Sequence, residues 1–337
     1  MVRLRHFAMA ALAALSLWIA TALPASAETL TLMAGGKEKI VYLPLVLASS
    51  LGYFKDEGLD VTITSQQAGI DTTTQLLSGA VQGVAGFYDH TIDLQTRGVE
   101  MVSLVVFGQS AGLVALAAPG SGIHRLSDIK GKRLGVTGLG SSTYFVTRYL
   151  AHRAGLSPRD YTVVPLVSGD TFHAAFQEGR LDVAIAEEPN ATQLIVEGHA
   201  IVLADMRTPE GTVTEFGGNY AGPCFYVRRT WLDAHRDEAQ KLVTALVRTL
   251  HYIHTHDAET IAKHLPEPDD TPHSALYLDA LRRSIPMFVA DGRMPDGVPE
   301  TALKVLMTSN PAINAHHVDL DRTYTNALVD ETLAKSR

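Results

Sequence analysis

Short apolar runs alternate along the chain with longer amphipathic segments. The runs read as buried strands because they are brief, rich in branched and aliphatic residues, and bounded by glycine or polar residues. We predict strands at Leu30–Met33, Asp60–Thr64, Val81–Ala85, Met101–Phe107, Leu113–Ala118, Arg133–Val136, Tyr161–Leu166, Leu181–Ile185 and Ile201–Ala204. Strands alternating with helices predict an α/β fold with parallel sheets covered by helices.

The predicted helices between these strands end at glycines. A glycine just past a helix end commonly takes a positive φ, which other residues resist. The glycines in question are Gly58, Gly79, Gly98, Gly155, Gly179 and Gly198.

The pattern repeats at an offset of 100 residues. The strand at 60–64 corresponds to the one at 161–166, and the strand at 81–85 to the one at 181–185. Gly69 and Gly169 precede the intervening helices, which Gly79 and Gly179 close. Although few residues are identical, the constant offset predicts two similar α/β lobes.

From Trp231 onward the pattern becomes helical. Helices are predicted at Leu232–His256, Ser274–Val289 and Pro299–Met307, with proline-rich breaks between them. This region is expected to be a helical tail packed on the lobes and not a third domain.

The first 27 residues have the composition of a secretory signal peptide. Arg3 and Arg5 precede a 17-residue apolar run, and Ala25-Ser26-Ala27 offers the small residues of a cleavage site. The run is short for a membrane anchor and lacks a charged flank. We therefore expect cleavage after Ala27 and a periplasmic product without a lipid anchor.

Charge and cysteine content narrow the classes of function. The full chain has a formal net charge of −8; without Arg3 and Arg5 it has 26 basic and 36 acidic residues, or −10. An acidic surface repels nucleic acids and anionic membranes. Cys224 is the only cysteine, which excludes an intramolecular disulfide, a cysteine–zinc site and an iron–sulfur cluster.

Two glycine-rich motifs resemble catalytic or cofactor loops. The segment 108–112 fits the G-x-S-x-G pattern of serine hydrolases, but a strand follows it where the nucleophile elbow requires a helix. The segment 135–143 resembles a dinucleotide loop, yet Thr143 replaces the third glycine. We expect no cofactor. The glycines and hydroxyls of Gly140, Ser141, Ser142 and Thr143 still suit a polar ligand at a helix N-terminus.

Histidines cluster at 251, 254 and 256 and again at 316–317. A spacing of three places two imidazoles on one helix face, as a metal site requires. Acidic partners are sparse there, so this segment is interpreted as a solvated helix and no metal site is expected.

Polar side chains follow the carboxyl ends of several predicted strands, where open parallel sheets bind ligands. These candidate ligand-binding residues are Tyr42, Gln67, Gly69, Tyr88, Asp89, His90, Asp170, Glu187 and Glu188. None of these residues is an arginine or a lysine. An anionic ligand beside unpaired carboxylates is unfavourable, so the set favours a neutral or amine-bearing ligand, such as a heterocycle stacked on Tyr42 or Tyr88. The alternative is that Glu187 and Glu188 point to solvent and towards a permease, which leaves a sulfonate among the candidate ligands.

Several longer segments resemble a known protein family. The family is that of the nitrate/sulfonate/taurine-type solute-binding proteins of ABC importers. The segments that look like it are Tyr42–Ala48 with Gly52–Val61, Leu126–Arg133, Gly140–Ser142, Phe176–Val183 and Glu188-Pro189. That group includes the thiamine-pyrimidine-type binding proteins, and the similarity covers roughly residues 30 to 230. Glu187-Glu188 departs from the sulfonate-binding members, which typically carry an aromatic residue before Asp-Pro.

The resemblance implies a two-lobed periplasmic binding protein fold of type II. Two parallel-sheet lobes are then joined by two hinge strands, near Gly108–Gly112 and Asn219–Pro223. The implied division is 28–110 with 222–337 for lobe 1 and 111–221 for lobe 2. Gln109, Ser110 and Tyr220 become hinge or ligand contacts, and Trp231 is expected to report lobe closure by its fluorescence.

The same resemblance implies a monomeric receptor without enzymatic activity, which captures a small molecule and delivers it to an ABC permease and its ATPase. Two other functions compete with this one. The first is a pyrimidine-precursor synthase on the same fold, which donates a histidine and carries a cysteine cluster. The second is a secreted hydrolase using Ser110.

Overall fold

The computed structural model describes residues 29–66, 69–166, 170–266, 273–310, 313 and 318–335. The expected signal peptide, residues 1–27, lies outside the described residues. No helix within the described ranges is both long enough and apolar enough to span a bilayer.

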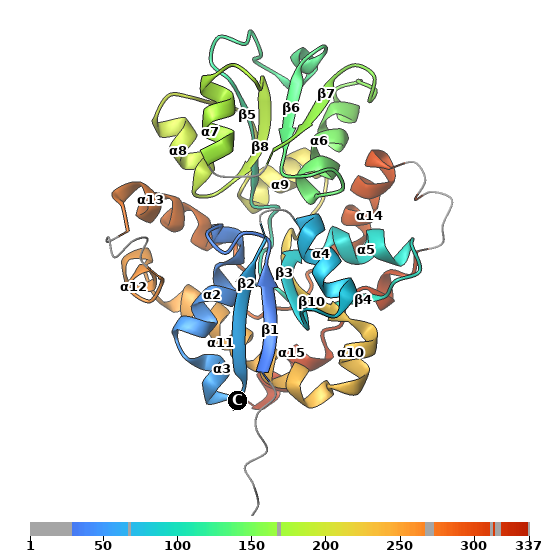
Figure 1. The fold of residues 1–337 in the computed structure, drawn as a ribbon, viewed down its shortest axis with the longest axis vertical. Helices are drawn as coiled ribbons and strands as arrows, with labels where there is room; N and C mark the ends of the chain where they lie inside the picture. The colour runs from blue at the N-terminus through green and yellow to red at the C-terminus, as the bar shows by residue number, and fades with distance from the viewer. Residues whose placement is uncertain are drawn as a thin grey trace, which may run out of the picture.

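The described strands form two five-stranded sheets, one in each of two lobes stacked along the long axis (Figure 1). The first lobe has the order β2-β1-β3-β10-β4, and the second has β7-β6-β8-β5-β9. The first sheet contains β1 (Thr29–Ala34), β2 (Asp60–Ser65), β3 (Gly83–Phe87), β4 (Met101–Val106) and β10 (Pro223–Arg228). The second contains β5 (Leu113–Ala117), β6 (Arg133–Val136), β7 (Thr162–Pro165), β8 (Val183–Glu187) and β9 (Ile201–Met206).

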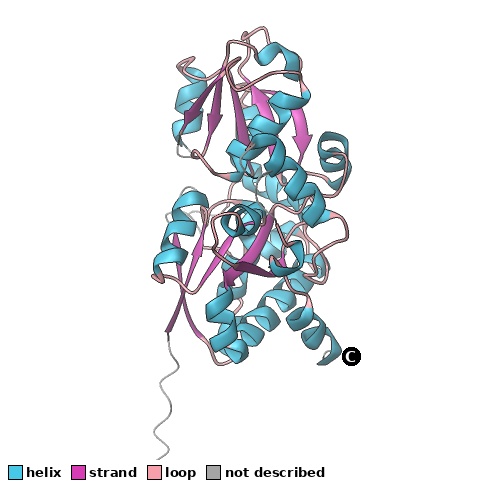
Figure 2. Cartoon of the chain, turned by 90° about the vertical axis from the view of Figure 1, so that its right-hand side faces the viewer, coloured by secondary structure: helices cyan, strands magenta, loops and turns pink. Residues whose placement is uncertain are grey.

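Helices cover both sheets, as the side view shows (Figure 2). Those of the amino-terminal half are η1 (Ile40–Tyr42), α2 (Leu43–Ser50), α3 (Tyr53–Asp56), α4 (Gly69–Ser78), α5 (Asp89–Gln95), η2 (Leu126–Ile129) and α6 (Ser142–Arg153). The second lobe adds α7 (Asp170–Gln177), α8 (Asn190–Val196) and α9 (Pro209–Phe216). The remainder are α10 (Arg229–Ala234), α11 (Arg236–Thr255), α12 (Ala258–Ala262), α13 (Ala275–Ser284), η4 (Ile285–Met287), α14 (Val298–Ser309), η6 (Leu320–Arg322) and α15 (Ala327–Lys335).

Burial follows the position of each strand. The inner strands β3, β5 and β8 are buried at every residue, which explains their unbroken apolar sequences. The edge strands β2 and β7 mix exposed and half-buried residues. The predicted α/β fold is confirmed, and so are the helix-closing glycines, which all have φ between 63° and 80°.

The two sheets share one topology, which confirms the internal repeat. Each strand of the first order has its counterpart at the same place in the second. Strands β3 and β8, and likewise β4 and β9, lie 100 residues apart in the sequence. The duplicated unit therefore extends further along the chain than the strands from which it was predicted.

The sheets are mixed, where the sequence predicted parallel ones. Strand β10 runs antiparallel to β3 and β4, and β5 runs antiparallel to β8 and β9. Both are the strands that follow a crossing from the other lobe. Strand β10 was not among the predicted strands, and it begins at Pro223, where the second crossing was expected to end.

The chain passes between the lobes twice, through residues 107–112 and 207–222. The two connections lie side by side, since the Gly112 amide donates to the carbonyl of Met206 and the Gly222 amide to that of Ser110. Gly112 has φ +66°, and a Cβ there would lie 2.8 Å from Val41. The lobe boundaries predicted at 110/111 and 221/222 fall within these connections and remain a prediction.

The carboxyl-terminal helices pack mainly on the first lobe, with α13 and α14 reaching α8 and α6 of the second (Figure 1). The single helix predicted at 232–256 is divided into α10 and α11 at His235. Trp231 lies on α10 and stacks on His235. The six residues of β10 separate it from the crossing, roughly 20 Å of strand. It is therefore poorly placed to report lobe closure.

Candidate ligand site between the lobes

A small polar cavity lies where the carboxyl ends of both sheets meet. The first lobe contributes residues that follow β1, β2 and β3, and the second contributes residues that follow β6 and β8. The lining residues are Lys39, Tyr42, Gly69, Phe87, His90, Thr137, Ser141, Ser142, Thr143 and Glu187. Its volume is about 10 Å³, which holds no more than one water molecule. The lobes are therefore closed on each other, and any organic ligand requires them to separate.

A buried ion pair joins the two lobes in this cavity. The Lys39 ammonium lies 3.2 Å from Oε1 of Glu187, and their side chains are only 3% and 6% exposed. The prediction that no lysine or arginine reaches the candidate ligand-binding residues is wrong. Lys39 follows β1, as Tyr42 does, and the same strand-end criterion applied to that loop would have found it. It was missed because Lys37-Glu38-Lys39 reads as a solvated charged turn.

Asp89 forms a second connection between the lobes. Its Oδ1 accepts a 2.7 Å hydrogen bond from Ser142, which opens α6 in the second lobe. Its Oδ2 accepts a 2.9 Å hydrogen bond from the Tyr220 hydroxyl, in the second crossing. The carboxylate is fully buried, and these two donors satisfy both of its oxygens. Closure thus depends on Asp89 as well as on Lys39.

The ring of His90 forms one wall of the cavity and is 2% exposed. It meets the Phe145 ring of the second lobe edge-on, with the centroids 6.3 Å apart. A Cβ added to Gly69 would lie 2.7 Å from its Nε2. Glycine at position 69 therefore leaves the space that this imidazole occupies.

The Tyr42 and Phe87 rings form the aromatic part of the cavity wall. They pack edge-to-face with centroids 6.3 Å apart. Burial, aided by the nearby Glu187 carboxylate, raises the pKa of Tyr42 well above its ordinary value. Its hydroxyl therefore stays protonated and able to donate. The wall suits a flat ring with a polar edge.

The β6–α6 loop supplies hydroxyls held in a fixed network. Ser141 is the N-cap of α6 and accepts from the Tyr144 amide, while its own hydroxyl donates to the carbonyl of Gly138. Thr143 accepts from the Thr137 amide at 3.0 Å. Gly140 has φ +82°, which lets the loop turn into the helix. These hydrogen bonds stabilise the loop itself, so its glycine and hydroxyl residues do not require a bound nucleotide to explain them.

Glu188, next to the cavity residue Glu187, holds the second lobe together. Its carboxylate accepts from the amide and hydroxyl of Thr192 at 2.9 and 2.8 Å, and from Arg207 at 2.6 Å. Its backbone carbonyl accepts from the Ile40 amide across the cleft. The carboxylate is buried and paired, so it faces neither the cavity nor solvent.

Other predicted site residues lie outside the cavity. The Tyr88 hydroxyl hydrogen-bonds to Thr323 and so cannot stack on a ligand in the cleft. Gln109 donates to the carbonyl of Pro286, and Ser110 donates to that of Arg207. Gln67 and the side chain of Asp170 lie outside the described residues.

Sequence reasoning also missed Phe87 and Thr137. Phe87 was overlooked because it is the last residue of a strand whose end had been predicted two residues earlier. Thr137 directly follows β6, so its strand-end position was a usable signal. Both residues lie at the carboxyl end of a strand, as the other candidates do.

Other cavities among the described residues are larger, and two of them bear on the choice of site. One of about 860 Å³ lies between α6 and α14 and contains none of the predicted site residues. Another of about 410 Å³ shares Lys39 with the small cavity and is otherwise mostly apolar. It is lined by Lys37, Glu38, Lys39, Ile40, Leu43, Val46, Pro189, Leu265, Pro266, His273 and Tyr277. Of these three cavities, the small one brings strand ends of both lobes together with a convergent set of polar groups.

Comparison with known proteins places the chain in a family. Residues 39–260 match the model of the NMT1/THI5-like family, and the chain belongs to this family. YtlA of Bacillus subtilis, named as a candidate binding protein, is 24% identical over 72% of this chain and 73% of its own length. The 4-amino-5-hydroxymethyl-2-methylpyrimidine phosphate synthase of Schizosaccharomyces pombe is 30% identical. That similarity covers only 48% of this chain and 46% of the synthase.

Solved structures confirm the fold. A Bordetella bronchiseptica protein is 31% identical and superposes with a TM-score of 0.86, covering 91% of this chain and 98% of its own. The alkanesulfonate-binding protein SsuA of Xanthomonas axonopodis pv. citri, bound to MOPS, gives a TM-score of 0.68 at 19% identity, over 88% and 98% of the two chains. The predicted two-lobed periplasmic binding protein fold is therefore correct.

Proposed function

We propose that this member of the NMT1/THI5-like family is a solute receptor that captures a small organic molecule between its lobes and delivers it to an ABC importer. One observation supports this most strongly. The polar cavity takes its walls from both lobes, and the Lys39–Glu187 and Ser142–Asp89 contacts cross it. Such contacts form on closing and break on opening, which is how a hinged receptor binds and releases a ligand.

The cavity favours a flat, polar and uncharged or amine-bearing ligand. Lys39 and Glu187 neutralise each other, and the Asp89 carboxylate is satisfied within the protein. A simple anion would have to compete with Glu187 for Lys39. A heterocycle with an amino group can accept from Lys39, donate to Glu187 and pack on Tyr42. The similarity to pyrimidine phosphate synthases makes an aminopyrimidine the first ligand to test.

The receptor function includes export and a partner. Residues 1–27 are proposed to direct the chain to the periplasm and to be removed there. The mature protein would then act as a monomer that docks on a permease coupled to an ATPase. Amino-terminal sequencing of the exported protein checks the first step, with Glu28 as the expected first residue.

Ligand binding is tested with the purified mature protein. A thermal-shift panel should contain 4-amino-5-hydroxymethyl-2-methylpyrimidine, taurine, nitrate and simple amines, and calorimetry should follow each hit. We expect the aminopyrimidine to bind and Glu187→Gln to weaken binding by roughly 10-fold or more, as for a lost hydrogen bond to a charged group. Glu38→Gln, an exposed carboxylate nearby, is the matched control. Tight taurine or nitrate binding that Glu187→Gln leaves unchanged would contradict the proposed ligand class.

An enzyme on the same fold is the second candidate, favoured only by the synthase similarity. Cys224 is the single cysteine and lies fully buried in β10, where burial raises the pKa of its thiol to about 12. A reactive cysteine cluster is therefore not available. Mass spectrometry after incubation with ligand distinguishes the two, because a receptor returns the ligand and its own histidines unchanged.

A serine hydrolase is not supported by the geometry. Ser110 is fully buried, donates to a backbone carbonyl and is followed by strand β5 instead of a helix. Esterase activity that Ser110→Ala abolishes would contradict this assignment.

A further inference from the structure

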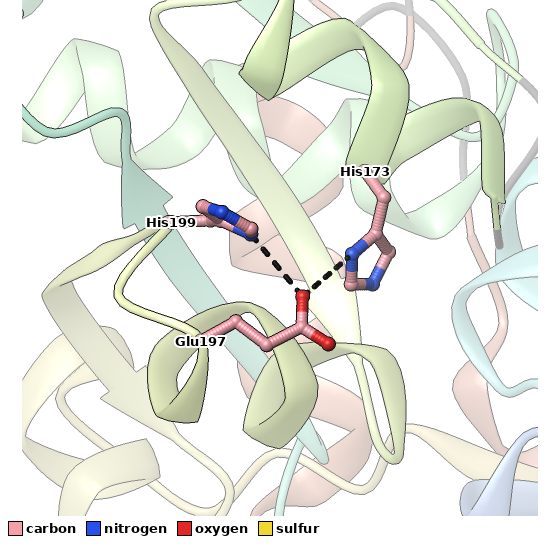
Figure 3. Close-up of side chains that lie close together, drawn as sticks. All are labelled: His173, Glu197 and His199. Carbon is pink, nitrogen blue, oxygen red and sulfur yellow. Dashed lines mark hydrogen bonds and ion pairs between the residues drawn. The ribbon is translucent and has the colours of Figure 1, made fainter.

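Two histidines and a glutamate converge on the second lobe, away from the proposed ligand cavity. His173 lies on α7, Glu197 follows the last residue of α8, and His199 follows two residues later (Figure 3). One ligand atom from each residue lies within 4.8 Å of the others. None of the three belongs to the histidine clusters at 251–256 and 316–317, which lie close together in the sequence.

The geometry directs both imidazoles at one carboxylate oxygen. Nδ1 of His199 lies 3.1 Å and Nδ1 of His173 lies 3.6 Å from Oε2 of Glu197. The other oxygen, Oε1, accepts a 3.0 Å hydrogen bond from Gln193. Gln193 thereby orients the carboxylate and leaves Oε2 to the histidines, as outer-shell partners do for metal ligands.

The backbone around the cluster is fixed. Gly198 has φ +72°, and the His199 amide donates to the carbonyl of Leu194 at 2.8 Å. This helix-ending turn brings the His199 ring back over Glu197. Helices α7 and α8 share a core, because Phe172 and Leu194 belong to one buried cluster. Three ligands on such a scaffold need only side-chain rotations to approach one another.

His173 supplies an independent observation. Its side chain is 13% exposed, and Nε2 is buried without a hydrogen-bond partner among the described residues. The polar contact that the structure shows for this ring is that of Nδ1 with Oε2 of Glu197, at 3.6 Å. A buried imidazole whose other nitrogen is unsatisfied is uncommon in a purely structural role.

We propose that His173, Glu197 and His199 form a binding site for a divalent transition-metal ion, with Zn²⁺ as the preferred test ion. Two imidazole nitrogens and one carboxylate oxygen are a common three-ligand set for Zn²⁺, with a fourth position open to water. Tetrahedral Zn–N bonds of about 2.0–2.1 Å require ligand atoms about 3.3 Å apart. The three ligand atoms lie within 4.8 Å of one another, so metal binding requires side-chain rotations that bring them closer. The site lies within one lobe, so metal binding does not need lobe closure.

Calorimetric titration of the untagged, chelator-treated mature protein with ZnCl₂ tests the proposal. We expect one Zn²⁺ per chain at this site. His199→Gln and Glu197→Gln should each weaken Zn²⁺ binding by more than about 10-fold. Removing even an outer-shell partner of a metal ligand commonly causes a loss of this size, and these residues are direct ligands. Both residues are more than a third exposed, so these variants should fold, and circular dichroism checks that they do. Co²⁺ provides a second readout, through the visible absorption of a tetrahedral site.

Matched controls exclude other histidines. His256→Gln, at the exposed end of α11, and the double change His316→Gln/His317→Gln should leave Zn²⁺ binding unchanged. Absence of Zn²⁺ binding to the parent protein would overturn the proposal, as would equal affinity in His199→Gln and Glu197→Gln. Neither result bears on the receptor function, because no transport ligand is present in the titration.

Discussion

Replacing Lys39 with methionine isolates the role of the buried ion pair between the lobes. Methionine keeps most of the length and apolar contact of the lysine stem but removes the charge. Glu187 then remains without its cation in a site where its side chain is 6% exposed. Lys37→Met is the matched control, because Lys37 is exposed and lies only two residues away.

The expected magnitude follows from the burial. Removing one partner of a buried ion pair costs about 3–5 kcal/mol when the other charge stays buried. Here the other charge can escape, because Glu187 becomes hydrated when the lobes separate. We therefore expect the closed state to be disfavoured by roughly 100-fold or more, since each 1.4 kcal/mol is tenfold. The free energy of global unfolding should fall by less than about 3 kcal/mol.

Small-angle scattering and urea unfolding measure these two effects. Lys39→Met should increase the radius of gyration and Lys37→Met should not. The double variant Lys39→Met/Glu187→Met should return toward the parent radius, because replacing a buried ion pair by apolar residues of similar volume is often neutral or stabilising. If Lys39→Met matches Lys37→Met in both measurements, the ion pair does not hold the lobes together and this reasoning is refuted.

Three further changes have defined outcomes. Gly69→Ala places a Cβ 2.7 Å from Nε2 of His90. This overpacking should lower the free energy of unfolding, measured by urea titration, by about 1–3 kcal/mol. An unchanged free energy of unfolding would show that the His90 ring moves freely. Cys224, with a pKa raised by burial to about 12, should resist thiol reagents at pH 8 until the protein unfolds, and rapid stoichiometric labelling of the native protein would contradict this burial. Hydrogen bonds from Arg133 lower the pKa of Asp182 in the folded protein. The ionised Asp182 therefore stabilises the fold fully above its unfolded pKa of about 3.9. This stabilisation is lost as the pH falls through the lower pKa of the folded state. Asp182→Asn should therefore reduce stability by about 1 kcal/mol at pH 6 and much less at pH 2, and an equal loss at both would contradict the pairing.

The sequence predicted the fold well because periodicity and turn residues are local signals. The strands from 60 to 204 and the glycines that end helices follow from short windows, and the repeat gave the duplicated lobes. Strand direction is not a local property. The antiparallel β5 and β10 arise because the chain crosses between lobes and enters the other sheet from the opposite end.

The strand-end criterion selected Tyr42, His90 and Glu187, and the loop before α6 supplied Ser142; all four line one cavity. Their role in ligand binding stays a prediction. Which side chain of a strand-end loop turns inward depends on contacts with the other lobe, which no single-sequence pattern reports. Two neighbouring residues can therefore have different surroundings. Glu187 lines the cavity, while Glu188 pairs with Thr192 and Arg207.

The place of β10 in the first sheet has a consequence for the order in which the protein folds. Residues 223–228 lie between β3 and β4, so that sheet lacks an inner strand until the whole second lobe has been made. The strands of the second sheet, in contrast, all lie within residues 113–206. Because contacts distant in sequence form late, the second lobe should mature first as the chain emerges. The first lobe would remain incomplete, with its apolar strand edges β3 and β4 exposed, until the segment after the second crossing arrives.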